Sequence, residues 1–570
     1  MSNMEIAQIL YEVADLLEIK GVQFKPRAYR RAAQTIETLP EALKEIDRRG
    51  ELEKIPGIGA SIANKIREIL ETGELGYLEE LREELPQGLR ELVEIEGVGP
   101  KTALALYRNL KISSVDQLEA AAKQGKLRTM KGFREKTETN VLQGIAMYRS
   151  AQQRSLLGYV LPMALEIEEQ LQKCEAVKRI SLAGSIRRRK ETIGDVDILV
   201  TSDEPLEAMD FFVALPQVNR VIAKGKTKST VVLTNNLQVD VRVVDEESFG
   251  SALQYFTGSK EHNIELRELA IKRNWKLSEY GLLDKKANRR IAGEEEESIY
   301  ESLGLRYIEP ELRENRGELK AAAEGRLPNL LKYGEVKGDL HVHTDWSDGA
   351  YSIQEMAEET KRMGFEYLAV CDHSRTLRIA GGLTEEDLIK QMKEILKINE
   401  GIDGFTILSG VEVNIQTDGS LDIKDEVLAD VDIVVASVHS GFKQPREKMT
   451  ERMIAAIHND YVNVIGHPTG RIINRRKPYE IDLSEVFEAA SAQNVFMEIN
   501  AFPNRLDLSD TDCIKAKDYG LKMAIGTDAH NKDQLRYIDL GVATARRGWL
   551  EPKDVVNTLT VEQLMAALER

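Results

Sequence analysis

The side chains best suited to metal chemistry lie in the second half of the chain, where histidines and carboxylates follow short apolar runs. In GDLHVHTDWSDGA (338–350), His341 and His343 stand two positions apart, so both side chains project from one face of a strand. Six of the eight histidines lie at or near the ends of such runs. With three carboxylates they form one candidate ligand set: His341, His343, Asp348, His373, Glu412, His439, His467, Asp528 and His530.

The chemistry of this ligand set indicates a cluster of metal ions. Imidazoles and carboxylates together favour Zn²⁺, Mn²⁺ or iron, and the set is too rich in histidine for a Ca²⁺ or Mg²⁺ cage. Nine candidate ligands are too many for one tetrahedral ion, so two or three adjacent ions are predicted. Such a cluster lowers the pKa of bound water and clamps both oxygens of a phosphodiester displacement. One such histidine alone would more simply be a core or surface residue.

A second candidate centre lies in LAGSIRRRKETIGDVDILV (182–200). Asp195 and Asp197 alternate on a predicted strand and Asp240 lies on a further strand, so the three carboxylates can share divalent cations. Gly184 and Ser185 end the preceding strand, where they can cradle a phosphate. This combination suits two-metal nucleotidyl transfer, in which one ion holds a triphosphate and the other activates a 3′-hydroxyl. A lone Asp-x-Asp pair is common on strand surfaces; the neighbouring Gly-Ser loop makes this one specific.

Two segments of the first half share a pattern, IPGIGASIANKIREIL (55–70) and IEGVGPKTALALYRNL (95–110). In each, a Gly-x-Gly turn leads into a helix, where backbone N–H groups can approach a phosphate. The glycines are Gly57, Gly59, Gly97 and Gly99. Their recurrence indicates helix–hairpin–helix motifs, which grip the DNA backbone without reading sequence. Such turns also simply join helices, and that alternative stays open for either copy.

The elements that must position these residues follow from the apolar patterning. Helical spacing prevails to about residue 150, short β-branched runs follow, and from residue 336 seven β runs alternate with helices, which predicts a βα barrel. The family resemblances described below imply the following domains: a helical DNA-binding domain (1–85), a fingers-like helical domain (86–150), a palm of nucleotidyltransferase type (151–260), a thumb-like nucleotide-selection domain (261–315), a linker (316–335) and a phosphoesterase barrel (336–570).

Composition sets outer limits on function. The 570 residues are 42% hydrophobic and 30% charged, which is ordinary for a globular protein. No run approaches the roughly 18 apolar residues of a membrane helix, and the acidic N-terminus does not resemble a signal peptide. Three isolated cysteines fit a reducing cytoplasm. The net charge of −17 argues weakly against nucleic-acid binding, but basic clusters are local: RAYRR (27–31), IRRRK (186–190), KGKTK (224–228) and RIINRRK (471–477). Each cluster could equally be a solvated surface.

The motifs HVHTDWSDG, CDHS, GVEV, SVHS, GHP and GTDAH together resemble the polymerase-and-histidinol-phosphatase (PHP) domain. The resemblance covers about residues 336–570. It implies a distorted seven-stranded barrel with a trinuclear metal site and phosphoesterase activity. Every ligand position of that family has a matching residue among the nine named above.

Residues 1–312 resemble family X DNA polymerases, of which DNA polymerase beta is the best-known type. The resemblance makes Asp195, Asp197 and Asp240 the catalytic carboxylates. It implies nucleotide-binding roles for Gly184, Ser185, Arg188, Gly194, Tyr255, Phe256, Gly258 and Asn263, with Arg267 beside them and Arg154 as a further triphosphate contact. Tyr255 and Phe256 would lie beside the incoming sugar and Asn263 near the base; ordinary aromatic packing is the alternative for the first two.

Two positions qualify this resemblance. Gln238 stands where animal members often carry an arginine that interacts with the catalytic carboxylates and the primer end. Lys65 matches the Schiff-base lysine of the family's 5′-deoxyribose-phosphate lyase site, where Lys25 and Arg67 could lower its pKa. A solvated lysine that contacts phosphate is the alternative for Lys65.

Both resemblances meet in the bacterial and archaeal family X polymerases that carry a C-terminal PHP domain. We therefore expect a cytoplasmic, monomeric DNA polymerase that fills short gaps in DNA repair, including base excision repair. Its barrel would act as a 3′→5′ exonuclease, with abasic-site endonuclease activity as an addition. The expected ions are Mg²⁺ or Mn²⁺ at the carboxylates and two or three ions, Mn²⁺ before Zn²⁺ or iron, in the barrel. The expected partners are gapped or primer–template DNA and dNTPs, without a membrane.

Two other functions compete with this interpretation. One is a PHP small-molecule phosphatase with a vestigial DNA-binding polymerase module. The other is a nonenzymatic scaffold that recruits repair factors to gaps. The paired hairpins and the complete aspartate trio argue against the first, and intact ligand sets at two sites argue against the second.

Overall fold

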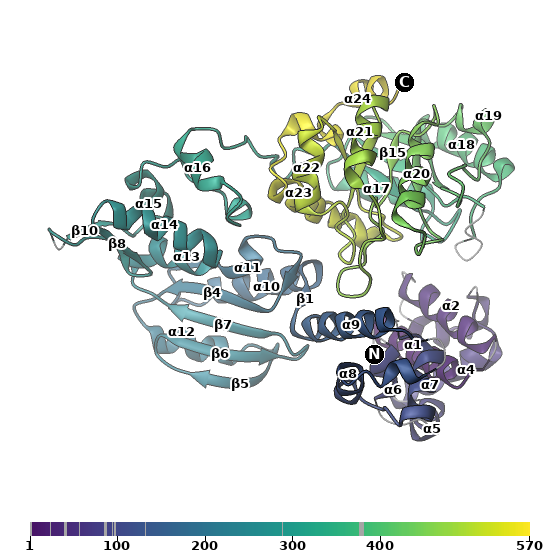
Figure 1. Ribbon diagram of the computed structural model, residues 1–570, viewed down its shortest axis with the longest axis horizontal. Helices are drawn as coiled ribbons and strands as arrows, with labels where there is room; N and C mark the ends of the chain where they lie inside the picture. Colours follow the sequence, from purple (N-terminus) through teal and green to yellow (C-terminus); the bar gives the residue numbers. More distant parts are fainter. Residues whose placement is uncertain are drawn as a thin grey trace.

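The computed structural model describes residues 3–22, 24–38, 43–55, 57–73, 75–84, 88–93, 95, 98–130, 133–287, 289–375 and 381–569. Figure 1 shows three parts: N-terminal helices in purple and blue, a mixed α/β region in blue and teal, and a C-terminal barrel in green and yellow. This arrangement confirms the predicted multidomain α/β fold class.

The N-terminal part is helical, with α1 (Asn3–Ile19), α2 (Lys25–Thr38), α3 (Leu43–Arg48), α4 (Ala60–Thr72), α5 (Gly76–Glu84), α6 (Leu89–Val93), α7 (Pro100–Leu110), α8 (Val115–Lys123) and α9 (Glu135–Gln153). Apolar side chains recur at helical spacing and form one buried face, as Ile6, Leu10 and Leu17 do on α1. These faces meet in one apolar core that runs from α1 to α9. Helix α9 leads from this core to the mixed region (Figure 1).

The region predicted as a palm, called the palm below, contains a sheet with strand order β2-β4-β7-β6-β5, in which β4 and β7 are parallel and the other neighbours antiparallel. The strands are β2 (Arg179–Leu182), β4 (Asp195–Thr201), β5 (Val218–Lys224), β6 (Lys228–Leu233) and β7 (Gln238–Val243). The helices are α10 (Leu157–Gln172), α11 (Gly184–Arg187) and α12 (Pro205–Val213), and β1 (Ser155–Leu156) pairs with β3 (Thr192–Ile193) beside the sheet.

Alternation along β4 sorts its side chains between two faces. Val196 and Ile198 are buried in the core with α10 and α12, while Leu199 packs toward the helix that begins at Phe249. Asp195 and Asp197 share the face of Leu199 because side chains two apart on a strand point the same way. The carboxylates are therefore held on the face of the sheet opposite its main core.

Helix α13 (Phe249–Thr257) lies at the end of the range predicted as palm and leads into the region predicted as thumb. That region contains α14 (Lys260–Lys272), the antiparallel strands β8 (Trp275–Ser278), β9 (Gly281–Asp284) and β10 (Arg289–Ala292), α15 (Glu296–Ser302) and η4 (Pro310–Leu312), and α16 (Glu318–Ala323) follows. Helix α16 lies in the segment predicted as a linker. Its Leu319 and Ala322 are buried in the thumb core, so this part of the segment packs against the thumb.

The C-terminal part is a parallel barrel with strands in sequential order, which matches the predicted seven β runs. The strands are β11 (Gly338–Val342), β12 (Tyr367–Val370), β13 (Thr406–Asn414), β14 (Ile433–Ser437), β15 (Val464–Ile465), β16 (Phe496–Asn500) and β17 (Met523–Gly526). The backbone N–H of His343 donates to Ala529 O at 2.9 Å and that of Asp528 to His341 O at 2.8 Å, which joins the first strand to the segment after the last.

Helices surround the barrel strands. They are α17 (Ile353–Arg362), α18 (Glu385–Asn399), α19 (Asp425–Leu428), α20 (Arg446–Ile457), α21 (Leu483–Gln493), α22 (Asp510–Asp518), α23 (Ile538–Arg547) and α24 (Val561–Leu568). Within the part of the chain that the structure describes, no helix is long and apolar enough to cross a membrane.

The barrel packs directly on the palm. Ile473, Leu506 and Leu540 of the barrel are buried in the same apolar cluster as the palm's α10 and sheet. Gly158 of α10 lies so close to the barrel that an added Cβ would sit 2.7 Å from Pro503 Cγ. The two halves therefore share one core, and their active sites are held in a defined relation.

Candidate active sites

The candidate metal ligands of the barrel meet at one end of the sheet. His341 and Glu412 lie within β11 and β13, and the other seven lie just after strands or in the loops that follow: His343, Asp348, His373, His439, His467, Asp528 and His530. This is the carboxyl-terminal edge of parallel strands, where barrel active sites are built. The backbone adopts positive φ at His467 (28°) and Asp528 (55°), a strained conformation for non-glycine residues that is concentrated at functional sites.

Eight of the nine candidates fall into three overlapping groups whose ligand atoms lie within 4.8 Å of one another: His343, Asp348, His373 and His530; His341, His343 and Asp528; and His373, Glu412 and His439. His467 joins them through Glu412, since its Nε2 lies 3.1 Å from Glu412 Oε1. The imidazole rings lie close together: the ring centroids are 4.2 Å apart for His343 and His530 and 4.4 Å apart for His343 and His373.

Protonation differs among the ligands of this cluster. Burial opposes charge on His341, His373 and His530, but neighbouring carboxylates outweigh it and raise their pKa values, that of His530 to about 9, so a metal ion would displace protons from these rings.

Other ligands are already in the form that binds metal. Burial and the neighbouring His530 lower the pKa of His343 to about 3. Burial and Arg505 lower that of His467 to about 4, so both rings are neutral at neutral pH. Burial opposes the charged forms of Glu412 and Asp528, but adjacent histidines outweigh it and hold both pKa values well below the usual range. Neutral imidazole and ionised carboxylate are the forms that ligate metals.

The unmet hydrogen-bonding capacity of the cluster also fits metal ions. Within the described residues, no hydrogen-bond partner reaches His341 Nε2 or His343 Nδ1, although both atoms are buried. Buried polar atoms are ordinarily paired, so orphaned ring nitrogens in a group of carboxylates indicate a missing cationic partner. The donor set suits transition metals more than Ca²⁺ or Mg²⁺.

Several side chains that orient the candidate ligands were not found from the sequence. His341 Nδ1 lies 2.6 Å from Glu498 Oε1, and the backbone N–H of His467 donates to Glu498 Oε2 at 2.5 Å. His439 Nδ1 lies 2.8 Å from Asn414 Oδ1. Such partners fix ring orientation and tautomer around a metal. Glu498 and Asn414 lie at the ends of predicted strands, which was the only available signal.

The three aspartates of the palm lie on adjacent strands. Asp197 on β4 is directly opposite Asp240 on the parallel strand β7, and Asp195 lies two residues before Asp197 on the same face. Burial, followed by the charges of Asp195 and Asp240, raises the pKa of Asp197 to about 6. Mutual repulsion of this kind is relieved by a divalent cation, and an oxygen-only set suits Mg²⁺ or Mn²⁺. Gly184, with φ of 67°, approaches this centre so closely that a Cβ would lie 2.9 Å from Asp197 Oδ2.

Lys228 is a further residue of this centre that sequence reasoning missed. Its Nζ lies 2.6 Å from Asp240 Oδ2, while Gln238 Nε2 lies 3.5 Å from the other oxygen of Asp240. A cation therefore accompanies the third aspartate although position 238 is not an arginine. Lys228 is the last residue of the basic cluster KGKTK, but only the pairing of β6 with β7 brings it to Asp240.

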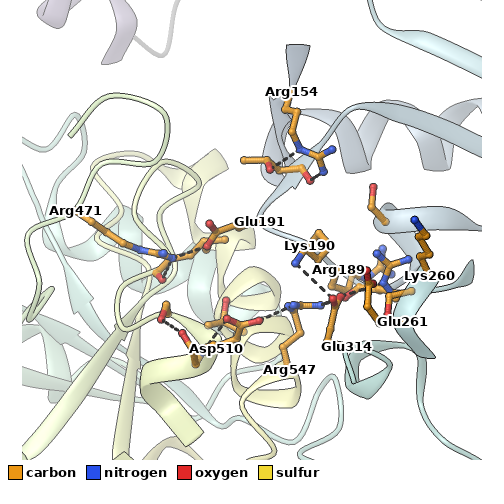
Figure 2. Close-up of a pocket in the computed structure, with 18 residues that line it drawn as sticks. Arg154, Arg189, Lys190, Glu191, Lys260, Glu261, Glu314, Arg471, Asp510 and Arg547 are labelled. Carbon is orange, nitrogen blue, oxygen red and sulfur yellow. Dashed lines mark hydrogen bonds and ion pairs between the residues drawn. The ribbon is translucent and has the colours of Figure 1, made fainter. Parts of the chain in front are cut away.

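A basic pocket of about 620 Å³ lies between the palm and the barrel (Figure 2). Of the predicted triphosphate residues, Ser185, Arg188 and Arg154 line it; Arg154 Nε donates to Thr192 Oγ1 at 2.9 Å. Gly194 lies in the palm between β3 and β4. Arg471 and Arg547 of the barrel line the pocket as well. Figure 2 shows that Glu191 and Glu314 lie among these cations and pair with Arg471 and Arg547.

The predicted base-side residues lie where α13 meets α14. Tyr255 and Phe256 are half-buried and contact edge to face, with ring centroids 5.1 Å apart. The guanidinium of Arg242 lies 4.6 Å from the Phe256 ring centre. Asn263 is buried, and its Nδ2 donates to Tyr255 O at 2.7 Å. Gly258 follows α13 with φ of 70° and faces the Arg188 guanidinium.

Two glycines stand at the starts of the hairpin helices. Gly59 is the N-cap of α4 and Gly99 that of α7, and a Cβ on either would meet nothing within 4 Å, so both helix N-termini are open to a ligand. Gly57 has φ of 82° and lies beside the Arg31 side chain. Gly97 lies outside the described residues. Lys65, on α4, extends its Nζ to 4.8 Å from the Tyr77 ring centre.

Family descriptions match most of the chain in consecutive segments. These are a helix-hairpin-helix domain over residues 1–75, a SAM-like helix-hairpin-helix tandem over 89–146, a DNA polymerase beta thumb over 252–314 and a PHP domain over 339–502. The matches define a family X type of polymerase chain joined to a PHP domain.

Whole-chain similarity narrows this class. The chain is 39% identical, over its full length and that of the relative, to the DNA polymerase/3'-5' exonuclease PolX of Bacillus subtilis strain 168. It belongs to this family of PolX proteins, in which family X polymerase and PHP domains occur in one chain. About a third of it, 34%, is also 37% identical to a protein named "Probable phosphatase" of Thermoanaerobacter sp. strain X514, and 30% identical to one named "Probable phosphatase YcdX" of Escherichia coli; each alignment covers 78% of that relative.

Proposed function

We propose that the protein is a DNA polymerase that fills short gaps during repair, including base excision repair, and that its barrel is a 3′→5′ exonuclease. One observation carries this proposal. A complete aspartate trio beside a basic pocket and a nine-residue set of histidines and carboxylates occur in one chain, in two domains with a shared core.

In the polymerase half, we assign Asp195, Asp197 and Asp240 as the catalytic carboxylates. Mg²⁺ or Mn²⁺ bound to them would activate the primer 3′-hydroxyl and neutralise the triphosphate. Ser185, Arg188 and Arg154 line the basic pocket and are assigned to the phosphates of the incoming dNTP, as are Gly184 and Gly194. Tyr255, Phe256, Gly258 and Asn263 are assigned to its sugar and base, beside the half-buried face of α13. Gly57, Gly59, Gly97 and Gly99 are assigned to the DNA backbone.

In the barrel, we assign the metal ligands to the nine-residue set, with two or three ions, Mn²⁺ before Zn²⁺ or iron. Ions held by these residues would lower the pKa of bound water and offset negative charge on the phosphodiester. Glu498 and Asn414 orient His341 and His439 by the contacts described above. Arg505, whose Nε lies 3.5 Å from Asp528 Oδ2, holds a positive charge beside the cluster for the phosphate. Cleavage at abasic sites uses the same chemistry and is included in the proposal.

Lys65 as a lyase nucleophile stays a prediction. Its ammonium lies over the Tyr77 ring, which is compatible with either a nucleophile or a phosphate contact. Trapping with borohydride on DNA that carries a 5′-deoxyribose phosphate distinguishes the two, because only a Schiff base becomes covalent. We further propose that the protein is cytoplasmic and monomeric. Gel filtration coupled to light scattering tests the oligomeric state, because a monomer has a mass of 64.1 kDa.

The test is a labelled, gapped duplex incubated with Mn²⁺, with and without dNTPs. We expect extension to be lost in Asp195→Ala and kept in His341→Ala, and shortening to show the reverse pattern. If neither product forms while histidinol phosphate is hydrolysed, the protein is instead a small-molecule phosphatase. If the duplex is bound but nothing is hydrolysed or extended, it is a scaffold.

A further inference from the structure

The barrel completes the polymerase's basic pocket. On the palm side the pocket is lined by Ser185, Arg188 and Lys190, and on the barrel side by Arg471 and Arg547. Figure 2 shows Lys190, Arg471 and Arg547 around it. Arg547 is the last residue of α23, a helix that packs on the barrel strand β17. A helix of the exonuclease half thus contributes a cation to the nucleotide-binding half.

Arg547 reaches Arg188 through one carboxylate and one carbonyl. Arg188 Nε donates to Glu314 Oε1 at 3.0 Å, and Arg547 Nη1 donates to the same oxygen at 3.1 Å. The same Nη1 donates to the backbone carbonyl of Arg188 at 2.7 Å. Lys190 Nζ lies 3.6 Å from the other oxygen of Glu314. All three side chains are largely buried: the exposed fraction is 13% for Arg188, 11% for Glu314 and 4% for Arg547.

Glu314 occupies the place of an anionic ligand for Arg188. Burial opposes its charge, but Arg547 and Arg188 outweigh that effect and keep its pKa below the usual value. Arg188 also donates from its Nη1 to the carbonyl of Thr257, which holds its guanidinium between α11 and the end of α13. A triphosphate that enters the pocket must compete with Glu314 for this guanidinium.

The partners of Glu314 set the strength of that competition. A buried carboxylate is stable only while cations compensate it. With Arg547 in place, Glu314 remains paired when Arg188 turns to a phosphate. Without Arg547, Glu314 depends on Arg188 and Lys190 and holds Arg188 more tightly. Arg547 is itself oriented by Asp510, which its Nη2 contacts at 2.5 Å.

We propose that Arg547 is a positioning residue of the polymerase site: by sharing Glu314 with Arg188, it releases Arg188 for the triphosphate of the incoming nucleotide. This inference rests on the proposed assignment of Arg188 to the triphosphate. It makes the exonuclease domain a contributor to nucleotide affinity, apart from any role in trimming DNA.

The test measures kcat and KM for dNTP on a single-nucleotide gap with the full-length Arg547→Met variant. Charge-assisted hydrogen bonds of this kind correspond to about five- to thirty-fold in an equilibrium constant, so we expect KM to rise by about that factor while kcat changes less than about twofold. Adding Glu314→Gln to Arg547→Met is expected to bring KM down to the value of Glu314→Gln alone, at or below that of the wild type, because the competing charge is gone. Loss of packing would not be rescued in this way.

The neighbouring Arg546 is the matched control. Arg546 lies on the same helix, is buried and also forms an ion pair between domains, with its Nε 2.8 Å from Glu311 Oε1. Glu311, however, does not line the basic pocket. Arg546→Met is expected to lower thermal stability without raising the KM for dNTP. If both arginine variants raise KM equally, the effect is a general consequence of interface loss and the proposal is wrong.

Two further variants separate the failure of this inference from failure of the site assignment. If Arg188→Gln leaves the KM for dNTP unchanged, the triphosphate assignment is wrong. If Arg188→Gln raises KM but Arg547→Met does not, only the inference fails. Should Arg547→Met not fold, Glu314→Gln alone decides: the inference expects KM to fall about fivefold because Arg188 loses its competitor, and an unchanged or higher KM would overturn it.

Discussion

Glu498 shows how one side chain organises two candidate metal ligands. One of its carboxylate oxygens lies against the His341 ring and the other accepts the backbone N–H of His467, from a different strand. It is 1% exposed, so neither contact is shared with solvent. The carboxylate thus fixes a ring on β11 relative to the strained turn after β15.

Glu498→Gln tests this role. A neutral amide lacks the negative charge that faces the His341 ring. Its NH₂ group would also have to replace one of the two carboxylate oxygens, where it would face either the His341 ring or the backbone N–H of His467. Loss of such an orienting partner typically costs about 10- to 100-fold in metal affinity or activity. We expect exonuclease activity and bound metal, measured by elemental analysis, to fall by that factor.

The polymerase activity of Glu498→Gln serves as the internal control, because the aspartate trio lies in another domain. Gap filling at the wild-type rate is expected. Equal loss of both activities would mean that the substitution unfolds the barrel and the shared core, and that Glu498 has no specific link to the metal site.

Residues that belong to a local motif were predictable, while residues recruited from a distance were not. The nine barrel candidates follow apolar runs, and the structure brings all nine together. Lys228 and Glu498 have no signature in their own segments. Their roles depend on strand pairing, β6 against β7 and β16 between β15 and β17, which a single sequence does not specify residue by residue.

At the level of elements, the start of α15 joins palm to thumb through one buried carboxylate. Glu296 is 3% exposed; its Oε2 lies 2.7 Å from Arg187 Nη2 of α11, and its Oε1 accepts from Arg313. Burial opposes the charge, but the two arginines outweigh it and lower the pKa of Glu296 to about 2. This carboxylate therefore stabilises the fold most when it is ionised.

Glu296→Gln is expected to lower the free energy of unfolding by about 3 kcal/mol at pH 7, since it leaves buried arginines without their charge partner. The folded-state pKa is below the usual 4.5, so the stabilisation is complete above about pH 4.5 and is lost as pH falls toward about 2. Urea unfolding at several pH values should therefore show the wild-type and variant curves converging below pH 4.5.

The adjacent Glu295→Gln is the control, because its pair with Arg179 is exposed, with 57% of the Glu295 side chain accessible. Such pairs contribute about 1 kcal/mol or less. An effect of Glu295→Gln as large as that of Glu296→Gln would contradict the proposed importance of burial.

The seven barrel strands are evident in the sequence, whereas the edge strand β5 of the palm sheet is not. Parallel strands covered on both faces are nearly continuous apolar runs, so they stand out from the sequence. β5 lies at the edge of the palm sheet, and its residues are largely exposed from Asn219 to Lys224. Without a buried face, it has no apolar alternation to detect.

At the scale of the whole molecule, the palm and barrel share an apolar interface. Ile473, Leu506 and Leu540 were indistinguishable in the sequence from ordinary barrel residues, so their burial against the palm could not be predicted. The placement of one domain on another depends on complementary surfaces, and those form only after both domains fold.

Gly158→Val tests this interface. Its Cβ would lie within 2.8 Å of Pro503 and Leu540, so the barrel must move away from α10. Overpacking of this kind costs about 1–3 kcal/mol. We expect faster proteolysis in the segment 324–337 and a larger radius of gyration by small-angle scattering.

Leu165→Ala, at an exposed position of the same helix, should change neither measurement. A Gly158→Val variant with wild-type proteolysis and scattering would show that the interface adapts without opening.

Helix α23 packs on the barrel sheet, while its last two residues bind Glu311 and Glu314 from the segment that ends the thumb. These ion pairs join segments on either side of the boundary between the two halves of the gene. A crossover between two diverged genes in the region of residues 324–337 would combine the arginines of one parent with the carboxylates of the other. Chimeras are therefore expected to be stable and active only when residues 309–314 and helix α23 come from the same parent. The two enzymes of this chain should evolve as one heritable unit.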